Sequence, residues 1–235
     1  MASIKILCRN VLEPLMESYG FLRYCSGLTY YLESYYRQVN DVLQILTFLK
    51  RGKMNSFAFN IIPLSMGNTQ LFVDRYDLTL KRGDWSEWIK INKPWECRNY
   101  RTACRQWWGE DELIDTNFEE PIKLIKEYVI PVFESGITSE SAYHQLMVFE
   151  KTVYPTVWMN SRGCVLLSLQ AGDYETAQLH MEAIYAQNGL EKSRLELERI
   201  KNRDTEYWDK VLEEGTKKTL DYLESIKPKR RSKRV

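Results

Sequence analysis

The chain has 235 residues and a mass of 27.9 kDa, a length that suits one large domain or two small ones. Hydrophobic residues make up 44% and charged residues 28% of the sequence, close to globular averages, which excludes a disordered, collagenous or simple coiled-coil protein. The net charge of +1 conceals an uneven distribution. Residues 227–235 carry six basic groups and no acid, whereas residues 1–226 carry 27 basic and 32 acidic groups, a balance of −5.

Three features of the sequence predict a cytoplasmic protein. Lys5 and Arg9 interrupt the first residues before an apolar segment can form, so a secretory signal is not expected. The longest uncharged stretch, residues 54–73, contains Pro63 and several amides, which favours strand and loop over a membrane helix. Five cysteines without a CxxC pair favour reduced thiols over a disulfide framework.

The first half of the chain predicts one helix followed by a sheet. Apolar residues spaced three and four apart indicate an amphipathic helix over residues 5–19, which Gly20 would end. Aromatic and β-branched residues then become frequent, and their connections are short, which favours antiparallel hairpins. Strands are expected at 21–25, 28–36, 39–50 and 54–62, with a further strand pair over 71–80.

The helical period returns at Cys97 and continues to about residue 136. The first predicted helix of this region ends in Trp107, Trp108 and Gly109, and an acidic loop over 110–115 follows. Asn117 and Glu120 have the spacing of a capping box, which predicts the start of the next helix. Pro131 is expected to kink or end that helix unless it lies in the last turn.

Beyond Gly136 the sequence predicts helices alone. They are expected from Ser139 to about Val153, over 156–171, over 174–187, and in a last helix that ends near Ile226. Gly172 and Asp173 suit the turn between the second and third of these helices. The last helix carries the i,i+4 pairs Glu206/Lys210, Glu213/Lys217 and Glu214/Lys218. Its apolar stripe has no evident partner, so it could pack on the sheet, on a protein partner or on a second copy in a homodimer. The stripe consists of Trp208, Val211, Leu212, Leu220, Leu223 and Ile226.

Catalytic, metal-binding and cofactor-binding motifs are missing from the sequence. His144 and His180 are the only imidazoles, and neither lies in a serine or cysteine signature. The sequence contains no metal-ligand spacing and no phosphate-binding glycine loop, so we expect no metal and no cofactor. The acid-rich residues 110–120 leave an enzyme with paired carboxylates open as an alternative, although a solvated loop explains them as well.

Two segments are candidates for binding. Arginines alternate with aromatic residues in the first, a combination that suits nucleic-acid backbones or a protein hot spot: Arg98, Arg101, Arg105, Trp107 and Trp108. The second is the basic tail, residues 227–235, which could contact phosphates: Lys227, Lys229, Arg230, Arg231, Lys233 and Arg234. The alternatives are tryptophans that pack on the sheet and a disordered tail that aids solubility.

Residues from about 8 to 136 resemble a bacterial family known as a domain of unknown function (domain of unknown function 4304). The resemblance rests on Gly20-Phe21, on the glutamine-bearing strand 42–46, and on Phe57 to Ile61. Cys97-Arg98, Trp107-Trp108 and Ile130 to Phe133 complete it. The resemblance implies an α+β fold for this half of the chain and assigns no reaction and no catalytic residue.

The sequence therefore predicts an α+β protein. We expect an antiparallel sheet of four to six strands with helices on one face in residues 1–136, an all-helical extension over 137–226, and a basic disordered tail over 227–235. The expected function is a non-catalytic protein-interaction module, in a bacterial conflict or immunity setting. The alternatives are a nucleic-acid-binding protein that uses the tail and the Arg98/Arg101/Arg105 face, and an enzyme of unrecognised chemistry.

Overall fold

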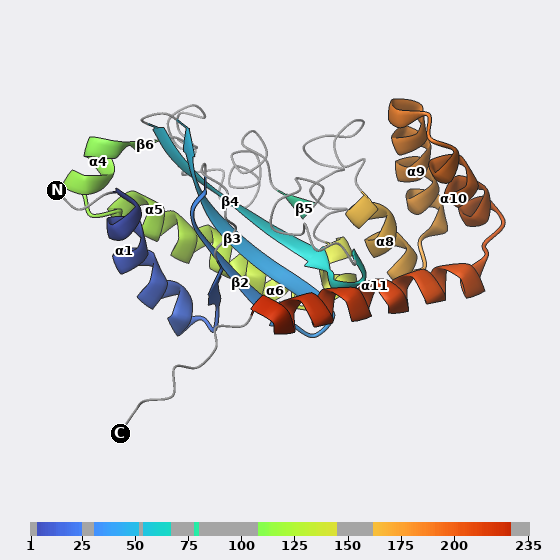
Figure 1. The fold of residues 1–235 in the computed structure, drawn as a ribbon, viewed down its shortest axis with the longest axis horizontal. Coiled ribbons are helices and arrows are strands. Elements are labelled where there is room, and N and C mark those ends of the chain that lie inside the picture. Colours follow the sequence, from blue (N-terminus) through green and yellow to red (C-terminus); the bar gives the residue numbers. More distant parts are fainter. Residues whose placement is uncertain are drawn as a thin grey trace, which may run out of the picture.

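The computed structural model describes residues 4–24, 31–51, 54–66, 78–79, 108–144 and 162–226. The strands are β1 (Leu22–Tyr24), β2 (Tyr31–Val39), β3 (Val42–Arg51), β4 (Met54–Pro63), β5 (Leu78–Thr79) and β6 (Trp108–Gly109). The helical segments are α1 (Ile4–Ser18), the 3-10 turn η1 (Leu64–Met66), α4 (Glu110–Asp115), α5 (Glu119–Leu124), the π-helical turn η2 (Ile125–Val129), α6 (Ile130–Ser135), α8 (Arg162–Gln170), α9 (Tyr174–Asn188), α10 (Glu191–Lys201) and α11 (Thr205–Ile226). The molecule is elongated, and α11 runs along one side from the α8–α10 end to the sheet (Figure 1).

An antiparallel sheet forms the centre of the larger part. Its order is β1-β2-β3-β4-β5, and β6 pairs with the opposite end of β4. Val39 pairs with Val42, so Asn40 and Asp41 form a two-residue hairpin between β2 and β3. The predicted α+β fold with four to six strands is confirmed, and β1 to β4 overlap the four strands expected over residues 21–62.

Alternation along β3 divides its side chains between two faces of the sheet. Leu46 and Phe48 are buried on the face that α1, α5 and α6 cover. Leu43 and Ile45 are buried on the opposite face, where they contact the end of α11. The helices of the first part thus lie on one face of the sheet, and the last helix of the extension covers part of the other (Figure 1).

The expected N-terminal helix is α1, and it ends where the sequence predicted. Its buried residues Cys8, Leu12 and Met16 recur every four positions and face the sheet. Gly20 has a φ of 79°, a left-handed conformation that glycine adopts without steric cost. The chain therefore turns at Gly20 and brings Phe21 into the core.

Residues 108–115 differ from the sequence-based prediction. Trp108 and Gly109 form the strand β6 instead of the end of a helix, because their backbone pairs with Asn55 and Met54 of β4. The expected acidic loop is the helix α4. Three of its four acids fall in the first turn, where negative charge stabilises a helix through the exposed N–H groups and the helix dipole.

The capping box predicted for Asn117 and Glu120 is wrong. The N-cap residue of α5 is Phe118, which has a φ of 63° and makes no side-chain capping hydrogen bond. The Phe118 side chain is fully buried, and its ring centroid lies 5.6 Å from that of Phe48. Burial of an aromatic ring therefore decides where this helix begins, in place of a polar cap.

Pro131 does not end its helix. The π-helical turn η2 precedes it, and α6 then begins at Ile130 with Pro131 in its first turn. Proline has no N–H to donate and its ring collides with the preceding turn of a regular helix, which the wider π turn accommodates. The helical run from α5 to α6 thus continues to Ser135 and keeps Val129 and Phe133 in the core.

The expected helical extension contains α8, α9 and α10. Gly172 has a φ of 75°, and the carboxylate of Asp173 accepts a hydrogen bond from the Thr176 N–H at 2.9 Å, so the predicted turn and cap are confirmed. α8 has buried residues on two sides. Val165 and Leu169 belong to the core of the extension, whereas Cys164 and Leu167 belong to the core beneath the sheet.

α11 connects the extension to the sheet. Trp208 lies in the core of the extension, and Leu223 lies beside Leu43 and Ile45 on the second face of the sheet. Between these ends the helix approaches η1 closely: a Cβ added to Gly215 would lie 2.7 Å from the carbonyl carbon of Ser65. Much of the apolar stripe for which the sequence offered no partner is therefore packed within the chain itself.

Candidate functional site

Among the predicted binding residues, Trp108 lies in the part of the chain that the structure describes. It is 1% exposed, and its ring stacks on Phe57 with centroids 5.7 Å apart. The indole Nε1 donates a hydrogen bond to Glu120 Oε2 at 2.6 Å. The indole is therefore part of the core. The other predicted binding residues lie outside the described residues: Arg98, Arg101, Arg105, Trp107, Lys227, Lys229, Arg230, Arg231, Lys233 and Arg234.

Three of the six acids in residues 110–120 have separate structural partners. Glu110 forms an ion pair with Lys50 at 2.9 Å, and Glu112 accepts a hydrogen bond from the Gly109 N–H at 3.2 Å. Glu120 accepts the hydrogen bond from Trp108. These contacts give the three carboxylates structural roles.

The two histidines lie in different surroundings. The side chain of His144 is 68% exposed, whereas His180 on α9 is 4% exposed. Burial lowers the pKa of His180 to about 4, and the nearby Asp173 opposes this only in part. Asp173 in turn accepts hydrogen bonds from the hydroxyl groups of Thr176 and Tyr143. His180 is thus a neutral residue of the core at physiological pH.

Glu33 on β2 holds a buried carboxylate between two arginines. Its side chain is 1% exposed, and its oxygens lie 3.1 Å from Arg9 Nε and 2.6 Å from Arg23 Nε. The pairing compensates the cost of burying the carboxylate and joins α1, β1 and β2. Burial also raises the pKa of the nearby Cys8 thiol, which keeps this free cysteine protonated.

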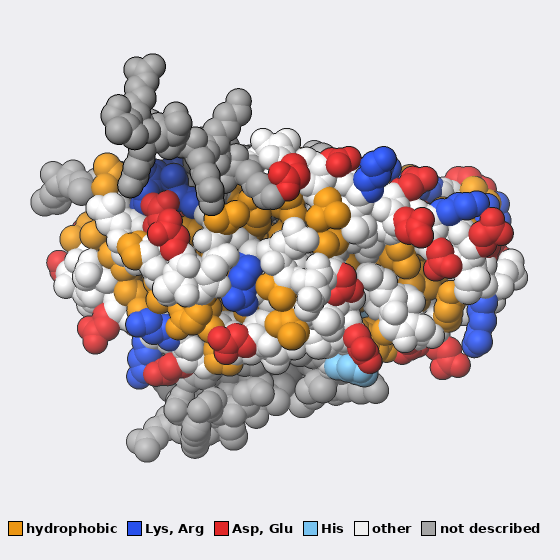
Figure 2. Space-filling view, turned by 90° about the horizontal axis from the view of Figure 1, so that it is seen from below, with side chains coloured by type: hydrophobic (Ala, Val, Ile, Leu, Met, Phe, Trp, Pro, Cys, Tyr) orange, Lys and Arg blue, Asp and Glu red, His pale blue; other side chains and the backbone are white. Residues whose placement is uncertain are grey.

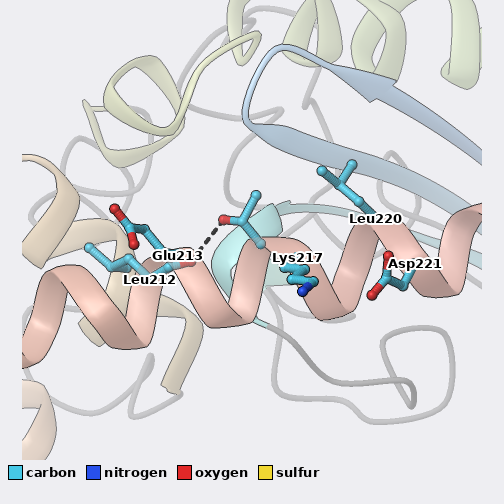
Figure 3. Close-up of a pocket in the computed structure, with 6 residues that line it drawn as sticks. Leu212, Glu213, Lys217, Leu220 and Asp221 are labelled. Atoms are coloured by element: carbon cyan, nitrogen blue, oxygen red, sulfur yellow. Dashed lines mark hydrogen bonds between the residues drawn. The ribbon is translucent and has the colours of Figure 1, made fainter.

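The strongest candidate for a functional surface is a groove along α11. It is a shallow depression, widely open to solvent, with a volume of about 450 Å³ and a mostly apolar lining. Six described residues, all on α11, line it in two rows of four-residue spacing: Leu212, Thr216 and Leu220 in one row, and Glu213, Lys217 and Asp221 in the other. Figure 3 shows these side chains along the helix. Figure 2 shows the face of the molecule along which α11 runs, with acidic and basic side chains mixed among apolar areas.

The charged row of the groove contains no ion pair among the described residues. The predicted pairs Glu206/Lys210 and Glu214/Lys218 form, at 3.0 and 3.8 Å, whereas Glu213 and Lys217 do not pair. Leu220 is 37% exposed although the sequence placed it in the apolar stripe. The groove thus combines exposed apolar surface with three charged side chains that are available to form ion pairs and hydrogen bonds with a partner.

Only an indirect signal in the sequence points to this groove. At 100° per residue the apolar stripe of α11 spans about 180° of the helix surface from Val211 to Leu220, so Leu220 lies at one edge of the stripe and Leu212 lies within it. That breadth exceeds what the sheet and the extension cover, but only the packing of α11 shows which side of the stripe stays exposed.

Within the described residues, no helix is long and apolar enough to cross a membrane. No group of three or more His, Cys, Asp or Glu side chains among them could hold a metal ion. Compared with protein-family models, with curated proteins and with solved structures, the chain matches none of them. The resemblance of residues 8–136 to the domain of unknown function gains no support from these comparisons and stays a prediction.

Proposed function

We propose that this protein is a non-catalytic protein-interaction module that binds its partner along α11. The observation that carries the proposal is the groove of about 450 Å³, in which exposed parts of Leu212 and Leu220 lie beside three charges. An exposed apolar surface rimmed by polar groups is typical of protein-binding sites. The structural roles found for Trp108, Glu110, Glu112 and Glu120 favour this proposal over an enzyme.

Site-specific photocrosslinking in the native host tests the proposal. A photoreactive residue placed at position 217 lies in the groove, whereas one at position 218 lies about 100° around the same helix. Lys218 is 65% exposed, so the two positions form a matched pair. We expect a covalent adduct with one protein from position 217 and a much weaker adduct from position 218. Equal labelling from both positions, or none from position 217, would contradict the proposal.

A further inference from the structure

We infer that the groove on α11 receives an amphipathic α-helix of another protein, with a basic–acidic–basic row beside its apolar row. This inference rests on the proposed function and adds the shape and charge of the partner. It is carried by two observations: the four-residue spacing of all six lining residues, and the sign of the charges in one of the two rows.

The spacing of the lining residues indicates a helix as the occupant. Residues four apart on a helix form a ridge, with about 6 Å between successive side chains along the axis. Leu212, Thr216 and Leu220 form one such ridge, and Glu213, Lys217 and Asp221 form the neighbouring one. The groove between two ridges of this kind accepts a ridge of a second helix, the commonest way in which helices pack. Figure 3 shows that these residues follow the axis of α11.

The charged residues of the groove define which charges the partner helix must present. Along the helix they read acid, base, acid at Glu213, Lys217 and Asp221, and none of the three makes an ion pair within the described structure. A partner helix matches them when it presents Lys or Arg, then Asp or Glu, then Lys or Arg at four-residue spacing. Because the pattern is the same in both directions, the partner fits in parallel or antiparallel orientation.

A partner helix with basic residues at both ends of its charged row also suits the net negative charge of α11. This helix carries six acidic and three basic residues, and residues 1–226 have a net charge of −5. Attraction between the acidic helix and a basic partner accelerates their association and disfavours acidic competitors.

A second copy of this chain matches the groove only in part. When two α11 helices pair in antiparallel orientation about Lys217, Glu213 faces Asp221 and Lys217 faces Lys217, which places like charges together. A shift by one turn pairs Lys217 with Asp221 but sets Glu213 against Ser225, and the opposite shift pairs Glu213 with Lys217 but sets Asp221 against Asp209. α11 does carry a basic–acidic–basic row at Lys210, Glu214 and Lys218, but these residues already pair within the helix. The apolar neighbour of that row, Val211, packs in the core of the extension. The row therefore lacks the exposed apolar ridge that the groove requires.

Two designed peptides test the inference on the full chain. Both are fluorescein-labelled amphipathic helices of equal length with the same leucine row, and circular dichroism checks that both are helical. The flanking row reads Lys–Glu–Lys in the first peptide and Glu–Lys–Glu in the second. We expect the first peptide to bind at least about tenfold more tightly in fluorescence anisotropy, since three attractive pairs replace three repulsive ones.

Charge reversal in the protein provides the decisive comparison. The triple variant Glu213→Lys, Lys217→Glu and Asp221→Lys is expected to prefer the second peptide. The control variant Glu214→Lys with Lys218→Glu changes the neighbouring row and is expected to retain the original preference. Urea unfolding shows whether each variant remains folded, as expected for exposed positions.

Three outcomes would overturn the inference. They are binding of neither peptide, a preference that survives the triple charge reversal, and self-association in sedimentation velocity that the control variant abolishes. Failure of the inference differs from failure of the proposed function. If position 217 crosslinks a protein but neither peptide binds, the interaction module stands and the helical partner is wrong.

Discussion

The Gln44 side chain joins the guanidinium of Arg37 on β2 to two backbone carbonyl groups at the end of α6. Its Oε1 accepts hydrogen bonds from Arg37 Nε at 2.9 Å and Nη2 at 2.7 Å. Its Nε2 donates to the carbonyl oxygens of Phe133 and Gly136 at the end of α6. All the hydrogen-bonding capacity of this fully buried amide is thus used, which is the condition under which a buried polar group stabilises a core.

We expect the substitution Gln44→Met to destabilise the protein by about 3 kcal/mol or more. Methionine has a similar shape but leaves the two buried carbonyl groups and the Arg37 guanidinium without their partner, at about 1–3 kcal/mol for each group. Urea unfolding measures the loss. Gln38→Met is the matched control, because Gln38 is exposed on the same hairpin, and its change is expected to stay within about 0.5 kcal/mol. Equal effects of the two substitutions would contradict this role.

His180 makes stability depend on pH. Its pKa is about 4 in the folded protein against 6.5 for an unperturbed histidine, because burial disfavours the charged ring. Between these values the unfolded chain binds a proton that the folded chain does not. The free energy of unfolding therefore falls as the pH falls from about 6.5 to about 4, by roughly 3 kcal/mol in total.

The substitution His180→Gln is expected to remove this part of the pH dependence. Unfolding free energies of the two proteins, measured from pH 7.5 to 4.5, should differ in slope, with the wild type steeper. His144→Gln provides the control, since His144 is mostly exposed. A slope unchanged by His180→Gln, or reduced equally by His144→Gln, would show that another group titrates.

At the scale of elements, α11 is held by a close backbone contact. Gly215 lies against the carbonyl group of Ser65, whose hydroxyl donates a hydrogen bond to Gln170 Oε1 of α8 at 2.9 Å. The hydroxyl groups of Tyr24 and Tyr222 lie 2.8 Å apart near the end of the helix. η1 thus brings α8, α11 and the end of β4 together, and it sets how α11 presents its groove.

We expect Gly215→Ala to destabilise the protein by about 1–3 kcal/mol. The added Cβ would lie 2.7 Å from the Ser65 carbonyl carbon, so that backbone must move. The direction of the change in unfolding free energy is diagnostic, because a Gly→Ala substitution in an unobstructed helix stabilises the protein by about 1 kcal/mol. Thermal or urea unfolding gives the result, and Thr216→Ala on the next residue of the helix controls for local effects. Stabilisation by Gly215→Ala would mean that α11 does not approach η1 so closely.

At the scale of the whole molecule, one long helix unites two packed parts. The core beneath the sheet and the core of the extension share α8, whereas α11 contributes to the extension and to the second face of the sheet. A surface along α11 is therefore backed by both parts of the protein, as a rigid binding site requires.

Removal of the basic tail separates the proposed function from its main alternative. For a chain that ends at Ile226 we expect an unfolding free energy within about 0.5 kcal/mol of the full chain and unchanged binding of the Lys–Glu–Lys peptide. Anisotropy with a labelled single-stranded DNA, at several salt concentrations, forms the second arm. DNA binding that falls steeply with salt and disappears with the tail would favour the nucleic-acid interpretation.

The sequence determined much of the fold on its own. The aromatic and β-branched residues of β2 to β4, the stripe of α1, the stop at Gly20 and the cap at Asp173 are local signals, and each formed the structure that it predicted. Local signals failed at Phe118 and Trp108, where burial of an aromatic ring and pairing with β4 outweighed helix capping and helical spacing. The groove on α11 was decided by the tertiary structure. Helical spacing shows which residues share a face, but only the approach of η1 and the sheet determines which side of that face remains in contact with solvent.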